Sequence, residues 1–530
     1  QVIAVVSSVC LVSSVALLVS ERRYLLVFPV IALSVLFYRY SLHSAFELRT
    51  LTNQYGNIVF YEESKYGRVV VTEDQNQYNF FESGQPLFSN LNIVSSEETV
   101  HYPLSQLKTV EDILLISGGA GGTIDEILKY KPRSIDYLEL DPVLIKAARQ
   151  YGFIKDQPSL HIIAQDGRAY IHQTPKRYSA IIVDIPDPDT FQLNRFFTDE
   201  FYSHTKGILK EYGILSFGLE VSPNYLPKYQ KNKLSSIYAT VKKYYKNVQV
   251  IPGEKAYFLC SDKGISLKIP ERLRRKSIET SYILGYFYGN VTKERIALLN
   301  QALYGDGDIN TDFSPTVMSI LFMNWFQKHE SSPVYFILIV FVFLIVYLTS
   351  LRREEFILFT TGFAAMGTEI LIILVFQVIY GYIYLKIGAI ITSFLVGLLP
   401  GVIIGNRWVY EGREWLIHSE ITLSVLLGIL CVWIPLWGDT TPQPLFLVYA
   451  FLFAFVCGFQ FPIAAARIGE NKSPAAGCFA ADLAGASFGT IITGVVFVPF
   501  AGIIMSICFL VLFKVVSIGF GITLSKGSQQ

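Results

Sequence analysis

Glycine and acidic residues recur at positions where they could bind a nucleoside. A glycine-rich run occupies 117–122 (SGGAGG), and an acid follows it in 138–141 (LELD). A backbone without side chains lets a ligand approach closely, and an acid shortly afterwards can accept hydrogen bonds from both ribose hydroxyls. For the glycine run alone, a tight turn is the alternative. The combination predicts nucleoside binding through Gly118, Gly119, Gly121, Gly122 and Glu139.

Further acids follow two later predicted strands. Asp166 and Gly167 lie where a side chain could meet an adenine edge, and a helix N-cap is the alternative role of Asp166. The segment 184–189 (DIPDPD) carries three acids at the edge where open α/β sheets bind their ligands. Three uncompensated carboxylates favour a cationic ligand, whereas a turn built by prolines and aspartates is the alternative.

The elements that must position these residues follow a βα pattern. Apolar strand-like runs alternate with helix-like runs, which predicts an α/β doubly wound, Rossmann-like domain of the methyltransferase type. A later helix and two strands close this sheet, and short alternating runs before it predict a small N-terminal β-hairpin subdomain. The predicted strands are 58–61, 68–72, 78–81, 113–116, 135–138, 161–164, 180–183, 214–217, 248–251 and 256–259, and the predicted helices include 124–130, 143–151 and 228–244.

Composition places this domain within a membrane protein. Of 530 residues, 52% are hydrophobic and 16% are charged, and the net charge is +1. These values exclude disorder and a purely cytosolic enzyme, and they give no reason to expect nucleic acid as a partner. The six cysteines form neither a disulfide framework nor a metal-ligand spacing, so we expect no metal.

Apolar runs of near-spanning length predict about nine transmembrane helices in an all-α polytopic bundle. They lie at 1–19, 24–39, 332–350, 356–379, 382–405, 418–437, 445–464, 476–500 and 503–523. We therefore divide the chain into two helices (1–40), a hairpin lid (41–110), the Rossmann-like domain (111–330) and about seven helices (331–530). The chain begins in an apolar run with no basic stretch or cleavage site, so we expect a fragment or a processed product.

The ordered motifs resemble the spermidine synthases, the polyamine aminopropyltransferases. The resemblance covers about 50–312 and rests on 113–122, 138–141, 165–167 (QDG), 182–188 (IVDIPDP) and 195–202 (RFFTDEFY). Segments 66–69 and 97–102 are similar to that family's β-lid and substrate gate. In the apolar part, 362–364 with Glu369 and 480–486 resemble the multi-spanning forms in which bacteria fuse such a domain to a helix bundle.

This resemblance implies transfer of an aminopropyl group from decarboxylated S-adenosylmethionine to an amine, with no tightly bound cofactor. Asp184 then matches the general base, and His101 takes the position of a gate tyrosine, where it could relay a proton. Glu139 and Asp166 match the ribose and adenine contacts. The resemblance further implies substrate binding by Asp187, Tyr102 and Asp189.

Two departures from the family pattern leave other functions open. Ala120 replaces an aspartate that grips the donor's terminal amine, and Pro103 replaces an acid in the gate. S-adenosylmethionine itself, or a different amine, is therefore an alternative ligand. The alternative functions are a methyltransferase and a sensor or transporter that binds a nucleoside or polyamine without turnover.

The apolar part contains two acids and two glycine pairs within its predicted helices. Glu369 and Asp482 lie in apolar helices, where they predict either a polyamine or proton route or an internal hydrogen bond. Glycine pairs 401/405 and 485/489 have the spacing that lets helices pack closely.

The expected location is the bacterial plasma membrane, with lipid and a polyamine substrate as partners and a homodimer left open. The membrane side of the Rossmann-like domain is also open. Basic residues cluster in loops that place this domain outside, whereas an adenosyl donor places it in the cytosol. Those residues are Arg22, Arg23, Arg352, Arg353, Arg407, Arg413, Arg467 and Lys472.

Overall fold

The computed structural model describes residues 2–21, 24–41, 44–305, 307–381, 384–409, 412–438, 441–467 and 474–526. The chain divides into two compact units, Gln1–Leu91 and Asn92–Gln530, and each is treated separately below. Three of the basic loop residues that bear on the membrane side of the Rossmann-like domain lie outside the described residues, namely Arg22, Arg23 and Lys472.

The first unit combines three helices with an antiparallel sheet. Its strands pair in the order β1-β2-β3-β4. Gln75 and Asn76 both have positive φ between β2 and β3, the geometry of a tight hairpin turn. The elements are α1 (Val2–Ser20), α2 (Tyr24–Ser41), α3 (Ser44–Tyr55), β1 (Ile58–Glu63), β2 (Arg68–Asp74), β3 (Gln77–Glu82) and β4 (Gln85–Ser89).

The second unit is built on a seven-stranded sheet in the order β10-β11-β9-β8-β5-β6-β7. The strands from β9 to β7 are parallel, as expected for a doubly wound fold, whereas β11 runs antiparallel to both β9 and β10. The sheet is therefore mixed and not parallel throughout. Its strands are β5 (Asp112–Ile116), β6 (Ser134–Leu138), β7 (Leu160–Ile163), β8 (Tyr178–Val183), β9 (Leu209–Glu220), β10 (Asn247–Pro252) and β11 (Lys255–Ser261).

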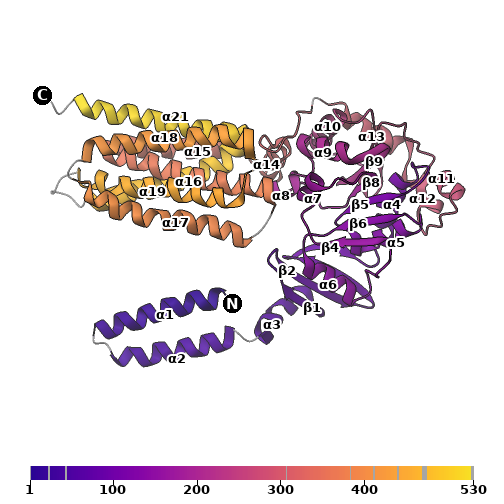
Figure 1. The fold of residues 1–530 in the computed structure, drawn as a ribbon, viewed down its shortest axis with the longest axis horizontal. Helices are drawn as coiled ribbons and strands as arrows, with labels where there is room; N and C mark the ends of the chain where they lie inside the picture. Colours follow the sequence, from indigo (N-terminus) through magenta and orange to yellow (C-terminus); the bar gives the residue numbers. More distant parts are fainter. Residues whose placement is uncertain are drawn as a thin grey trace. The chain divides into compact units, whose positions relative to one another are not determined.

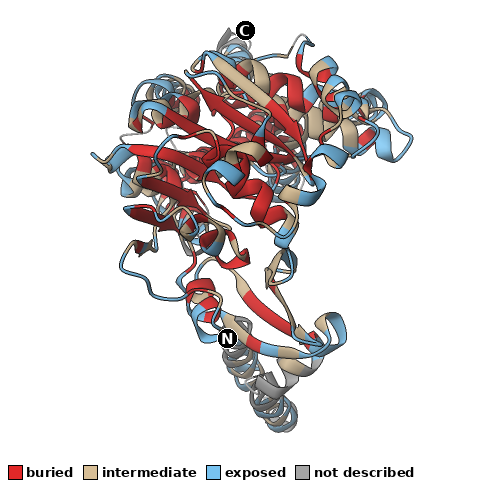
Figure 2. Ribbon diagram, turned by 90° about the vertical axis from the view of Figure 1, so that its right-hand side faces the viewer, coloured by how far each residue is buried: buried red, intermediate tan, exposed pale blue. Residues whose placement is uncertain are grey.

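Helices cover this sheet, and its central strands are buried (Figure 2). Helix α4 packs with this unit, against α5, β9 and β11, although the sequence placed it in the lid subdomain. The helices are α4 (Ile93–Leu104), η1 (Gly119–Gly121), α5 (Thr123–Leu128), α6 (Pro142–Gln150), α7 (Gly167–Gln173), α8 (Phe191–Asn194), α9 (Asp199–Ile208), α10 (Lys228–Lys242), α11 (Ile269–Arg275), α12 (Ile283–Asn290), α13 (Lys293–Leu303) and α14 (Thr316–Lys328).

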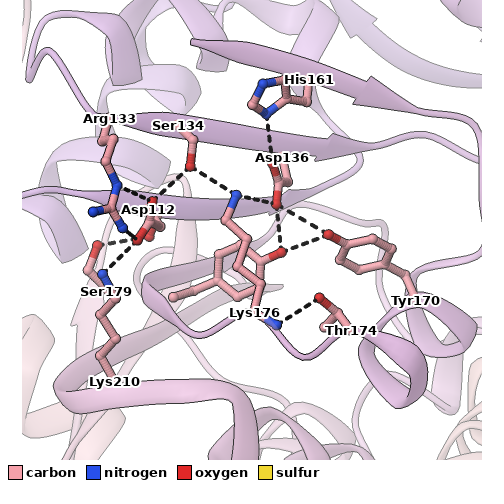
Figure 3. A network of polar contacts seen from close by, with 11 residues as sticks. Asp112, Arg133, Ser134, Asp136, His161, Tyr170, Thr174, Lys176, Ser179 and Lys210 are labelled. Carbon is pink, nitrogen blue, oxygen red and sulfur yellow. Dashed lines mark hydrogen bonds and ion pairs between the residues drawn. The ribbon is translucent and has the colours of Figure 1, made fainter.

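A polar network holds the amino-terminal half of the parallel strands together (Figure 3). Asp112 begins β5 and accepts hydrogen bonds from Arg133, Ser134 and Lys210. Burial raises the pKa of Asp112, but these donors outweigh it and hold the pKa below its usual value. The neighbouring acid, Asp136 of β6, accepts from Lys176, Tyr178, Tyr170 and His161. Because ligands bind open α/β sheets at the opposite, carboxyl edge, we assign this network a structural role.

The remainder of the second unit is a bundle of long helices that run side by side (Figure 1). A π-helical turn, Ile492–Phe497, joins its last two helices. The helices are α15 (Pro333–Ser350), α16 (Arg353–Tyr380), α17 (Tyr384–Arg407), α18 (Gly412–Trp437), α19 (Gln443–Ala465), α20 (Pro474–Ile491) and α21 (Val498–Lys526).

Six segments of the described residues are long and apolar enough to cross a membrane. The predicted helices 476–500 and 503–523 lie in one continuous apolar segment of 45 residues, Ala475–Gly519. The predicted break between them falls at Gly502, which has a φ of +78°. Ile503 donates its N–H to the carbonyl of Phe313 there, at 2.8 Å. The predicted runs 1–19 and 24–39 include residues whose side chains lie outside the description.

Glycines bring pairs of bundle helices into close contact. A Cβ on Gly485 would overlap the backbone of Phe359, and a Cβ on Gly401 would overlap that of Phe455. The packing role predicted for the glycine pairs 401/405 and 485/489 is therefore confirmed. Asp482 lies against Gly362 of α16. In that helix, Gly362 precedes the buried Glu369 by about two turns.

Candidate active site

Strand register gathers the predicted site at one edge of the sheet. The last residue of β5, Ile116, pairs with the last residues of both neighbouring strands, Leu138 of β6 and Val183 of β8. The residues that follow these strands must therefore emerge at the same carboxyl edge. They include the glycine loop, Glu139 and Asp184.

The glycine loop is shaped around Asp184. Gly118 and Gly122 have φ values of +72° and +98°, a backbone conformation that favours glycine. A Cβ on Gly118 would overlap the carboxylate of Asp184, and a Cβ on Gly119 would lie 2.7 Å from the Tyr137 ring. Gly118 thus lets the strand β8 acid pack directly against the loop, whereas Gly121 lies in the short helix η1.

Glu139 is buried at the end of β6. Its carboxylate accepts hydrogen bonds from the Tyr137 hydroxyl at 2.9 Å, the Ser117 hydroxyl at 3.2 Å and the Leu140 N–H at 2.9 Å. Burial raises the pKa of Glu139, and these donors only partly offset that effect. The carboxylate is held in a fixed orientation, as a ribose contact requires.

Asp184 faces Lys255 as well as the glycine loop. Lys255 Nζ lies 3.3 Å from Asp184 Oδ1, and the Thr123 hydroxyl lies 3.5 Å from Oδ2. Burial lowers the pKa of Lys255, but the neighbouring acids, Asp184 foremost, outweigh it and raise the pKa above its usual value. The predicted general base therefore already has a cationic partner.

Asp187 is also compensated within the chain. It forms an ion pair with the buried Lys233 of α10 and accepts the Glu220 N–H at 2.8 Å. The third acid of the segment, Asp189, is exposed, and its N–H donates to the Asp187 carbonyl at 2.7 Å. Segment 184–189 is thus partly a hydrogen-bonded turn, which is the alternative to a cation site that the sequence left open.

Asp166 caps a helix and joins the two parts of the second unit. Its Oδ1 accepts the Ala169 N–H at 3.1 Å at the start of α7, and its Oδ2 forms an ion pair with the buried Arg195. Arg195 also donates to the carbonyls of Val378 and Ile379, each at 3.3 Å, in the last turn of α16. Gly167 packs against Ile116 and Phe196.

The predicted gate residues have hydrogen-bond partners of their own. His101 is buried, and its ring nitrogens bond to the Tyr130 hydroxyl at 2.9 Å, just after α5, and to Glu126 of α5 at 2.8 Å. Tyr102 is buried as well and donates to Glu98 at 3.1 Å. The structure therefore brings Glu139 and Asp184 together with the glycine loop, whereas the side-chain hydrogen bonds of His101 and Tyr102 go to Tyr130, Glu126 and Glu98.

Sequence reasoning missed three cations that contact the predicted acids: Lys255, Lys233 and Arg195. Lys233 occupies the buried face of α10 beside Leu234 and Ile237, and a lysine at an apolar position was a usable signal for a buried partner. Lys255 precedes the apolar run of β11, where no comparable pattern marks it. Among the described residues, no group of three or more His, Cys, Asp or Glu side chains is placed to hold a metal.

The strand order and the βα connections define an α/β domain of the Rossmann type. Residues 93–264 match the family described as the spermine/spermidine synthase domain. This match confirms the resemblance found in the sequence.

Similar proteins include several called polyamine aminopropyltransferase. The one from Oceanobacillus iheyensis is 30% identical over 30% of this chain and 33% of its own length. The one from Sulfolobus acidocaldarius is 31% identical over 36% of this chain and 65% of its own. The chain spans about a third of the first of these relatives.

Solved structures of spermidine synthases are also similar. One, in complex with the transition state analogue AdoDATO, is 25% identical, with a TM-score of 0.41 over 47% of this chain and 88% of that chain. Another, from Thermotoga maritima, is 25% identical, with a TM-score of 0.40 over 47% of this chain and 87% of that chain.

Proposed function

We propose that the chain is a membrane-bound transferase of the aminopropyltransferase type. The observation that carries this proposal is the contact of Asp184 with Gly118, which sets an acid beside a nucleoside-type glycine loop whose other flank holds Glu139. The donor is an S-adenosyl compound, either decarboxylated S-adenosylmethionine or S-adenosylmethionine itself. The long apolar helices anchor the enzyme in the membrane.

In this reaction an amine nitrogen attacks the donor carbon attached to the sulfonium sulfur. The new C–N bond forms as the C–S bond breaks, methylthioadenosine leaves with the sulfur electron pair, and the amine proton passes to Asp184. Glu139 orients the ribose, and the glycine loop allows the nucleoside to approach the backbone. The contribution of the protein is position and charge, because the sulfonium is already an activated leaving group.

The first test is mass spectrometry of small molecules after detergent-purified protein is incubated with either donor and a mixture of di- and triamines. We expect methylthioadenosine and a lengthened amine, with at least a hundredfold loss in Asp184→Asn because general bases contribute about 10²–10⁴-fold. Asp156→Asn, at an exposed acid, is the matched control and should retain activity. Turnover that survives in Asp184→Asn would contradict the assignment of the base.

A second candidate function is a sensor whose nucleoside site acts on the helix bundle. The contact that favours it is Arg195, which links Asp166 to the last turn of α16. The same experiment separates the candidates: binding of donor without any product, unaffected by Asp184→Asn, would favour the sensor. Release of S-adenosylhomocysteine would instead indicate a methyltransferase.

A further inference from the structure

The Lys255 side chain extends across the sheet toward the candidate site. It begins β11, and its side chain crosses the neighbouring strand β9 at Gly218. A Cβ on Gly218 would lie 2.8 Å from Lys255 Cδ and 3.2 Å from Lys255 Cβ, so a larger residue would obstruct this path. The absence of a side chain at 218 thus allows Nζ to reach Asp184.

The Lys255 ammonium retains hydrogen-bonding capacity. An ammonium group has three N–H donors. Among the described residues, the hydrogen bonds of Nζ go to Asp184 alone, at a rather long 3.3 Å. The side chain is 23% exposed, so the remaining donors can meet a ligand that enters from the carboxyl edge.

Two acids of the site that could attract a cationic ligand tail already have cationic partners. Lys255 compensates Asp184, and Lys233 together with a backbone N–H compensates Asp187. The loop 117–122 contains Ala120 and no acid. A ligand tail that carries only an ammonium would therefore meet Lys255 beside two acids that already have cationic partners.

We infer that Lys255 selects an adenosyl ligand whose tail carries a carboxylate over one whose tail carries only an amine. The ligand class is that of S-adenosylmethionine, whose tail has both a carboxylate and an ammonium, and the disfavoured class is its decarboxylated form. The carboxylate would take the free donors of Nζ, and a charge-assisted hydrogen bond of this kind is among the stronger ones. This inference rests on the proposed nucleoside site.

Binding measurements on the detergent-purified full chain test the inference. Isothermal titration calorimetry should use three ligands: methylthioadenosine, which lacks the tail, S-adenosylmethionine and decarboxylated S-adenosylmethionine. We expect S-adenosylmethionine to bind about tenfold or more tightly than its decarboxylated form. In Lys255→Gln this ratio should fall to roughly one, with the affinity for methylthioadenosine unchanged.

Two further variants separate charge from structure. Lys255→Arg keeps the cation and should keep the preference, whereas Lys263→Gln removes an exposed lysine just beyond the opposite end of β11 and should change none of the three affinities. Equal or tighter binding of the decarboxylated ligand by the unmodified protein overturns the inference, as does a ratio that Lys255→Gln leaves intact. Methylthioadenosine still binds in those cases, so the proposed site stands; if it does not bind, both proposals fall.

Discussion

Gly118 is the residue on which the geometry of the site depends most directly. Its φ is +72°, and a Cβ there would overlap Asp184. Gly118→Ala should therefore destabilise the protein by about 1–3 kcal/mol through backbone strain and overpacking, and it should weaken nucleoside binding. The thermal-unfolding midpoint in detergent and a methylthioadenosine titration measure the two effects.

The matched control for this substitution is Gly264→Ala. A Cβ on Gly264 has no neighbour within 4 Å, so the change should leave both measurements within error. Equal behaviour of the two variants would show that the loop does not depend on the absence of a side chain at 118.

At the scale of elements, α4 is tied to the turn between β10 and β11 by Glu98. This carboxylate is buried and accepts the Glu254 N–H at 2.7 Å and the Tyr102 hydroxyl at 3.1 Å. Burial raises the pKa of Glu98 to about 7, and these donors only partly offset it. The folded protein therefore binds a proton that the unfolded chain releases near pH 4.5.

The sign of the resulting pH dependence follows from this difference. The contribution of Glu98 to stability is fully present below about pH 4.5 and is lost as the pH rises through about 7. We expect the thermal-unfolding midpoint to fall over this range, and Glu98→Gln to remove that part of the slope. Glu211→Gln, at an exposed acid, is the control, and a slope unchanged by Glu98→Gln would contradict the assignment.

At the scale of the whole molecule, a buried ion pair joins helices of the bundle. Lys514 of α21 lies 2.5 Å from Glu420 of α18 and also donates to Thr361 of α16 at 2.9 Å. Gln460 of α19 donates to the same carboxylate at 2.6 Å. Four helices therefore meet at one polar cluster in an otherwise apolar bundle.

Removing one partner of this pair should cost more than removing both. Lys514→Met leaves a buried carboxylate without its cation and should cost about 3–5 kcal/mol, whereas Lys514→Met combined with Glu420→Leu should recover much of the loss. The thermal-unfolding midpoints of the two variants in detergent test this expectation. A double variant no more stable than the single one would indicate that the cluster does more than pair charges.

The spacing and pattern of residues along the sequence determined the domain type and the helix bundle. The βα alternation, the glycine loop, the ordered acids and the long apolar runs follow from properties of neighbouring residues. The domain type, its similarity to the spermine/spermidine synthase domain and the helix bundle could therefore be predicted. The glycine pairs were predictable for the same reason, because their spacing places them on one helix face.

Only the tertiary structure decided which charges meet. Lys255 reaches Asp184 from two strands away across Gly218, and Arg195 joins Asp166 to a helix that begins more than 150 residues later. His101 matched a gate position, yet its ring nitrogens form hydrogen bonds with Glu126 of α5 and with Tyr130 just after that helix. Such contacts join residues far apart in the chain, so their partners depend on strand order and helix packing and not on local pattern.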